Sequence, residues 1–198
     1  MGVAEIVVGG LFSLVGGIGG GLLGGWYQDR RDKRDRPRLK LDFDAQVDKV
    51  EATWAGKYPF NGFILRASVR NEGVTSALNC RVFLTGLTRI HNSGSTDTGF
   101  IDARQVPWAG YIFDPIAIHR EGPFHVDFLR ISKENSGWIF IFKRKTEHDK
   151  TLTTYRGTYR FHLVAVADNA QPEHLNVDVD YNGDWNNLRA WRPSGENS

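Results

Sequence analysis

The sequence predicts a mainly-β protein in which a single N-terminal transmembrane helix carries one antiparallel β-sandwich. Three observations lead to this fold class. Residues 6–26 are apolar and uncharged, residues 29–37 are rich in arginine, and from residue 38 onward short segments alternate between apolar and polar side chains. Such alternation indicates strands with one buried face, and no stretch after residue 37 has a helical period.

The domain boundaries follow from these changes in composition. We expect a transmembrane helix at 1–28, a basic juxtamembrane linker at 29–37, a cytoplasmic β-sandwich at 38–192 and a disordered tail at 193–198. The formal charge of +2 is concentrated in the linker, so the remainder is close to neutral and no nucleic-acid partner is expected. The single cysteine, Cys80, allows no intramolecular disulfide and favours a reducing compartment.

The apolar run has the length and flanks of a membrane span. At about 1.5 Å per residue it covers about 30 Å, the thickness of a bilayer's hydrocarbon core. Glu5 precedes it and basic residues follow it, so the positive-inside rule predicts an N-out, single-pass protein of a bacterial inner membrane. These basic residues set the topology and could also bind anionic lipid headgroups. They are Arg30, Arg31, Lys33, Arg34 and Arg36.

Small residues gather on one side of this predicted helix and bulky aliphatic residues on the other. A smooth face of this kind lets two membrane helices approach closely. The face consists of Gly9, Ser13, Gly16, Gly17, Gly20, Gly21, Gly24 and Gly25. The pattern resembles the glycine-zipper helices of membrane oligomers, and the resemblance implies a homo-oligomer. The alternatives are a lone anchor without a partner helix and a peripheral or disordered segment.

The strands of the sandwich are expected where the two-residue alternation is clearest. The run at 138–142 is apolar throughout, which indicates a strand buried on both faces. The expected strands are 39–43, 63–70, 80–84, 124–131, 138–142, 159–167, 175–181 and 185–191.

One stretch of this region also resembles a known family. Residues 69–84, VRNEGVTSALNCRVFL, resemble the second-to-third strand region of bacterial immunoglobulin-like modules. The matching positions are Asn71, Gly73, Ala77 and the alternating Cys80, Val82 and Leu84. The resemblance implies a sandwich that binds or scaffolds rather than catalyses.

The string Asp178-Val-Asp-Tyr-Asn-Gly-Asp184 matches the start of a calcium-binding loop. The twelfth position, however, is Arg189, where calcium requires a bidentate glutamate. Asn182-Gly183 between two alternating runs is the favoured two-residue hairpin turn, so a hairpin is expected here.

No catalytic residue, metal site or cofactor is predicted elsewhere. The six histidines show no metal-ligand spacing, and His125 and His162 fall within expected strands. Motifs for an activated serine nucleophile or a phosphate-binding loop do not occur in the sequence.

The irregular segment from His91 to Gly122 is the candidate ligand-binding region. It opens with a polar loop and then carries aromatic and basic side chains, which suit an anionic or nucleotide ligand. The candidate residues are Arg104, Trp108, Tyr111, His119 and Arg120. Alternatively, these aromatic residues cap one end of the sandwich.

Together these features predict a non-enzymatic, membrane-anchored binding, scaffold or sensor protein that self-assembles through its glycine-rich helix. Its expected partners are membrane lipid, further copies of itself and an unknown protein or small molecule. The alternative is a ligand-gated pore-forming or membrane-disrupting effector of the bacterial defence type.

Overall fold

The computed structural model describes residues 35–55, 60–98, 100, 102–110, 112–134, 138–139 and 156–194. These residues belong almost entirely to the compact unit that begins at Pro37. The predicted transmembrane helix, Tyr111 and the last four residues lie outside the described residues. In the described part, no helix combines the length and apolar character needed to cross a membrane.

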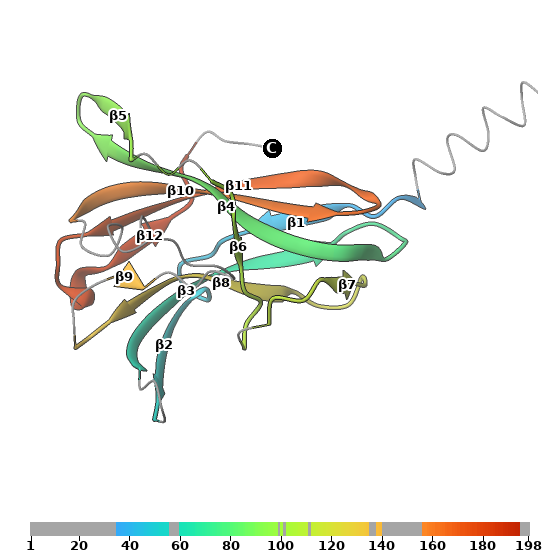
Figure 1. Ribbon diagram of the computed structural model, residues 1–198, viewed down its shortest axis with the longest axis horizontal. Coiled ribbons are helices and arrows are strands. Elements are labelled where there is room, and N and C mark those ends of the chain that lie inside the picture. Colours follow the sequence, from blue (N-terminus) through green and yellow to red (C-terminus); the bar gives the residue numbers. More distant parts are fainter. Residues whose placement is uncertain are drawn as a thin grey trace, which may run out of the picture. The chain divides into compact units, whose positions relative to one another are not determined.

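The described strands form two antiparallel sheets that pack together as a sandwich (Figure 1). The predicted mainly-β class is therefore confirmed. The first sheet, called the β3 sheet, has the order β1-β3-β8-β9, with β2 also paired to β3. Its strands are β1 (Leu39–Asp42), β2 (Lys49–Trp54), β3 (Phe60–Asn71), β8 (Phe124–Ser132) and β9 (Trp138–Ile139).

In the β3 sheet, two short strands share one edge of a long strand. β1 pairs with the last part of β3, where Leu41 lies opposite Val69, and β2 pairs with the first part, where Lys49 lies opposite Leu65. The chain between β1 and β2 leaves the ladder as a loop at 43–48. This loop places a carboxylate beside the sheet, as described below.

The second sheet, called the β4 sheet, has the order β12-β11-β10-β4-β5, and β6 and β7 also pair with β4. The long strand β4 has β10 on one edge and β7, β6 and β5 in succession along the other. The end of β4 and β5 project from the sandwich as a ribbon at the upper left of Figure 1. The strands are β4 (Ala77–His91), β5 (Gly94–Asp97), β6 (Arg104–Val106), β7 (Ile116–Ile118), β10 (Gly157–Ala167), β11 (Ala170–Tyr181) and β12 (Arg189–Trp191).

The core lies between the sheets and follows from the two-residue alternation. Leu65, Ala67 and Val69 of β3 point inward and are fully buried. The rings of Phe128 on β8 and Phe161 on β10 meet across the interior with centroids 5.5 Å apart. Because burying a leucine, valine or phenylalanine side chain contributes about 1.5–3 kcal/mol, this apolar interior is the main source of stability.

The last expected strand, 185–191, is only partly correct. Trp185–Asn187 form a short 3-10 helix, and only Arg189–Trp191 continue as β12, antiparallel to β11. The carboxylate of Asp184 accepts a hydrogen bond from the Asn186 amide at 2.9 Å, which caps the helix and ends the extended conformation. The two strands are therefore joined by a longer connection than the two-residue turn expected at Asn182-Gly183.

Several short strands escaped the sequence analysis. β5 lies inside the segment expected to be a polar loop, and all four of its residues are exposed. β2, β6 and β7 were not expected either. These three segments are strands because they pair with the free edges of β3 and β4. Such short segments contain too few residues to show an alternation of apolar and polar side chains.

Candidate functional site

The residues predicted to bind a ligand are distributed over different parts of the fold. Arg104 begins β6 opposite Leu84 of β4 and forms an ion pair with Asp102 at 3.2 Å. His119 and Arg120 follow β7, whose Ile118 lies opposite Ala77, the first residue of β4. Ala77 and Leu84 are seven positions apart on β4, which corresponds to about 20 Å along the strand. The structure does not bring Arg104 and His119 together.

Trp108 belongs to the interior of the sandwich. It is 4% exposed, is part of the hydrophobic core and packs edge-on against Phe124, with ring centroids 6.4 Å apart. Its backbone bridges to Ile112 and Val126 hold the indole in this place. Trp108 is therefore a core residue. The ligand site at Arg104, Trp108, Tyr111, His119 and Arg120 and the capping alternative both stay predictions.

The carboxylates of the calcium-like string face different partners. Both oxygens of Asp178 accept hydrogen bonds from Arg160, at 2.7 and 2.9 Å. Asp180 accepts one from Thr158, and Asp184 caps the 3-10 helix. Among the residues that the structure describes, no group of three or more histidine, cysteine or acidic side chains is placed to hold a metal ion.

His162 is held by its neighbours on the outer face of the β4 sheet. Nδ1 lies 2.6 Å from the Asn176 side-chain oxygen, and Nε2 lies 3.0 Å from the Thr88 hydroxyl. The ring packs over Gly86, where an added Cβ would lie 2.9 Å from the imidazole Cδ2. Both ring nitrogens are engaged in cross-strand contacts, which is the environment of a structural histidine.

A buried charge network lies on the outer face of the β3 sheet. Asp127 of β8 is 2% exposed and accepts hydrogen bonds from Arg66 Nε and Arg130 Nη2, each at 2.8 Å. Arg66 lies directly opposite Asp127 in the ladder. Charge-assisted bonds of this length are among the stronger polar contacts in proteins.

A β-bulge makes this network possible. Residues 127 and 130 would face opposite sides of a regular strand, because side chains alternate. The register between β3 and β8 shifts between Leu65 and Arg66, so Phe128 is an extra residue in β8. The shift leaves Phe128 and Leu129 in the core and brings Asp127 and Arg130 to the same outer face.

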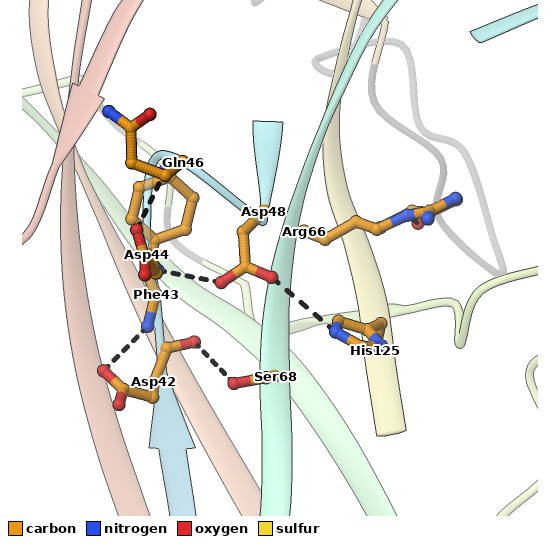
Figure 2. A network of polar contacts seen from close by, with 9 residues as sticks. Asp42, Phe43, Asp44, Gln46, Asp48, Arg66, Ser68 and His125 are labelled. Atoms are coloured by element: carbon orange, nitrogen blue, oxygen red, sulfur yellow. Dashed lines mark hydrogen bonds and ion pairs between the residues drawn. The ribbon is translucent and has the colours of Figure 1, made fainter. Parts of the chain in front are cut away.

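Asp48 joins the network from the loop between β1 and β2 (Figure 2). Its Oδ2 accepts a hydrogen bond from the Asp44 amide at 2.8 Å, and its Oδ1 lies 3.7 Å from Nε2 of His125. The Arg66 amide donates to the Asp48 carbonyl at 2.9 Å, which fixes the loop against β3. Asp44 in turn accepts from the Gln46 amide at 2.9 Å.

Burial dominates the electrostatics of the network. It raises the pKa of Asp48, while the Asp44 amide and the nearby His125 act in the opposite direction. Burial also raises the pKa of Asp127, and Arg66 offsets part of this effect. Burial lowers the pKa of Arg130 to about 10, so its guanidinium stays charged at neutral pH. Because the guanidinium groups of Arg66 and Arg130 both donate to Asp127, the geometry favours a structural role, in which the network holds β3 and β8 together.

A second polar cluster lies where the chain enters the sandwich. The buried Asn71 side chain accepts hydrogen bonds from the amides of Arg38 and Gly73, at 3.0 and 2.9 Å. Its amide group donates to the carbonyls of Thr75 and Ile118, at 2.7 and 3.1 Å. Asn71 thus uses its full hydrogen-bonding capacity to join the start of the domain, the β3–β4 turn and the end of β7.

Asn169 braces the neighbouring turn at the same end. It accepts from the Leu78 amide and donates to the Ser76 carbonyl, each at 2.9 Å. The Ser76 hydroxyl lies 2.6 Å from Nδ1 of His119. We call this surface the Arg38 end: Arg38, residues 71–78, His119, Arg120, Asp168 and Asn169. β7 and the β10–β11 turn mark it at the right of Figure 1.

Sequence reasoning singled out neither polar cluster as a site. Arg66 and Asp127 fall in the polar phase of two expected strands, so each looked like an ordinary exposed residue. Their pairing depends on the strand register and on the bulge at Phe128. Asn71 was noted only as a turn residue, and its contact with Ile118 requires β7.

No protein-family model matches the chain, and neither a curated protein nor a solved structure is significantly similar to it.

Proposed function

We propose that the protein is a non-enzymatic, membrane-anchored binding or scaffold protein that self-assembles through its glycine-rich helix. The observation that carries this proposal is the repeat of small residues at every fourth position from Gly9 to Gly25, inside an uncharged run. Association of helices in lipid depends on close packing, and small residues permit it. The basic residues after the run support an orientation with the sandwich in the cytoplasm.

Two features of the sandwich support a binding or scaffold role. The carboxylates of Asp127 and Asp178 accept hydrogen bonds from arginines of their own sheets. These charges therefore support the fold, as expected of a protein that binds rather than catalyses. Asn71 links the first residues of the domain to two other segments, so a force or displacement at Arg38 would be transmitted into the sandwich. Within this proposal the sandwich is immunoglobulin-like, as the segment around Asn71 suggests.

The mass of the detergent-solubilised full-length protein tests self-assembly. We expect an oligomer for the wild type and a monomer for Gly17→Leu with Gly21→Leu, because two bulky side chains would separate the helices. Val15→Phe with Ile18→Phe is the matched control, since it adds bulk on the opposite side and should leave the mass unchanged. A wild-type monomer, or an oligomer that persists in the glycine variant, would refute assembly through this face.

Protease protection tests the orientation. In right-side-out membrane vesicles the sandwich should resist added protease, and in inside-out vesicles it should be digested. The reverse pattern would contradict the proposed cytoplasmic location.

A further inference from the structure

His125 of β8 lies near two buried carboxylates on the outer face of the β3 sheet. Its Nε2 is 3.7 Å from Oδ1 of Asp48, a residue of the loop between β1 and β2. The His125 side chain is 31% exposed, whereas that of Asp48 is only 4% exposed. Figure 2 shows the imidazole directed toward this carboxylate. The second carboxylate is that of Asp127, whose pKa is raised by burial, an effect that Arg66 and His125 oppose.

The two carboxylates differ in the nature of their counter-charges. Asp127 accepts hydrogen bonds from Arg66 and Arg130, and arginine keeps its charge throughout the physiological pH range. Among the residues that the structure describes, His125 is the basic side chain that pairs with Asp48. Histidine ordinarily changes its charge between about pH 5 and 8. The counter-charge of Asp48 therefore depends on pH, whereas that of Asp127 does not.

The acidic groups around Asp48 make this counter-charge important. Burial has the largest effect and raises the pKa of Asp48, and the negative charges of Asp44 and Asp42 raise it further. The carboxylate of Asp42, on β1, is itself paired with Arg192, whose Nη1 lies 3.1 Å from Oδ1. Asp48 is thus an acid in an environment that disfavours its negative charge.

The neighbouring strands offer Asp48 no substitute for the histidine. On β3, the Nε of Arg66 is directed to Asp127, at 2.8 Å from Oδ1. Ser68, directly opposite His125 in the ladder, carries an uncharged hydroxyl. When His125 loses its proton, the ionised Asp48 therefore loses the cation with which it is paired.

The loop depends on Asp48 for its attachment to the sheet. Within the loop, the amides of Val47 and Asp48 donate to the Asp44 carbonyl, at 3.0 and 2.7 Å, and the Asp44 amide donates to Asp48 Oδ2 at 2.8 Å. Two contacts of Asp48 reach the sheet itself: its carbonyl accepts from the Arg66 amide at 2.9 Å, and its carboxylate faces His125. The ion pair is therefore one of two polar links between this loop and the neighbouring strands.

We propose that His125 and Asp48 form a pH-dependent latch, which holds the β1–β2 loop against β8 when the imidazole is protonated. Near pH 6 the imidazolium pairs with the carboxylate and the loop stays closed. Near pH 8 the neutral ring leaves a buried carboxylate without that counter-charge, and the loop opens more often. The inference goes beyond the proposed function and does not depend on the membrane anchor. It gives one edge of the sandwich a mobility that follows the pH of its surroundings.

Hydrogen exchange of the full-length protein in detergent, resolved to residues 43–48, tests the latch. Rates measured near pH 6 and near pH 8 are each divided by the intrinsic exchange rate at that pH. The protection of the Asp44, Val47 and Asp48 amides should fall about two- to fivefold at the higher pH, which is the size of effect that a partly exposed ion pair provides. Protection at 126–131 in β8 should not change. Equal protection of the loop at the two pH values would overturn the proposal.

Three variants assign the effect to this pair. His125→Gln and Asp48→Asn each remove one charge, and both should abolish the pH dependence of protection at 43–48. His174→Gln is the matched control, because His174 is an exposed histidine of β11 in the other sheet, and it should leave the pH dependence intact. A pH dependence that persists in His125→Gln, or that disappears in His174→Gln, would refute the latch. The wild-type comparison requires no substitution, so it decides the proposal even when a variant does not fold.

Discussion

Replacing Asp127 with asparagine should destabilise the protein severely, although the two side chains have nearly the same shape. The carboxylate is 1% exposed and is the acceptor for both Arg66 and Arg130. Asparagine removes the negative charge and leaves the Arg130 guanidinium, itself only 3% exposed, without that counter-charge. Asp127 then no longer offsets the repulsion between Arg66 and Arg130, which together with burial already lowers the pKa of Arg130.

The magnitude follows from the burial of the network. Removing one partner of a buried ion pair typically costs about 3–5 kcal/mol, because the other charge stays desolvated. A domain of this size is stable by about 5–15 kcal/mol in total, so the variant should lose a large share of its stability. Asp102→Asn is the matched control: it breaks an ion pair with Arg104, but its carboxylate is 62% exposed. Surface pairs contribute about 0–1 kcal/mol.

Urea unfolding of the full-length protein in detergent, followed by tryptophan fluorescence, measures both variants. The midpoint should fall strongly for Asp127→Asn and little for Asp102→Asn, with an unchanged slope. Adding Arg130→Met to Asp127→Asn should recover part of the loss, because it removes the buried charge that Asp127 no longer offsets. If Asp127→Asn lowers the free energy of unfolding no more than Asp102→Asn does, the network does not stabilise the fold and the reasoning is refuted.

Four further predictions concern stability, local hydrogen exchange and membrane integrity. Burial raises the pKa of Asp48 above 3.8, so its protonated carboxyl contributes stability at low pH that is lost as pH rises through the folded-state pKa. The stability of Asp48→Asn relative to the wild type, measured by urea unfolding, should therefore be higher at about pH 7 than at about pH 3. The opposite trend would contradict this. Gly62→Ala should lower the melting temperature sharply, because the added Cβ would lie 2.0 Å from a backbone carbonyl oxygen of β8. Gly94→Ala is the control and should be milder despite the positive φ of Gly94, because nothing lies within 4 Å of an added Cβ there. Similar falls in melting temperature would argue against the close approach of β8 to Gly62. Asn71→Ala should speed hydrogen exchange in the β3–β4 turn and at the end of β7, and unchanged protection there would exclude the bracing role. Under the proposed function, overexpression of the protein should leave the membrane potential of the cells intact. Depolarisation that is abolished by Gly17→Leu with Gly21→Leu would favour the pore-forming effector.

The agreement between sequence and structure differs from element to element. β1 and β8 were expected almost residue for residue, because apolar and polar side chains alternate in both, although one face is buried in β1 and both faces are buried over most of β8. β5 was missed because it lies at the sheet edge and all four residues are exposed, so it carries no apolar signal. The start of the expected strand at 185–191 was wrong because the Asp184 side chain caps a helical turn there. Such local hydrogen bonding competes with extended structure.

The candidate ligand residues show the same limit. Arg104, Trp108 and His119 are close in sequence, and that closeness suggested a common site. β6 and β7 pair with different parts of β4, so Arg104 and His119 are carried to separate positions, while Trp108 enters the core. The order in which short strands occupy a free edge depends on backbone pairing over the whole sheet.

By itself the sequence determined the β class, the antiparallel sandwich and the main strands, because alternation of apolar and polar side chains is a local consequence of burying one face of a strand. Only the tertiary structure decided which polar residues meet. Asp127 pairs with Arg66 and Arg130 because a bulge shifts the register of β8 by one residue, and Asn71 joins three segments that the sequence keeps far apart. A one-residue change of register moves a side chain to the opposite face, and that choice is made by the packing of the whole domain.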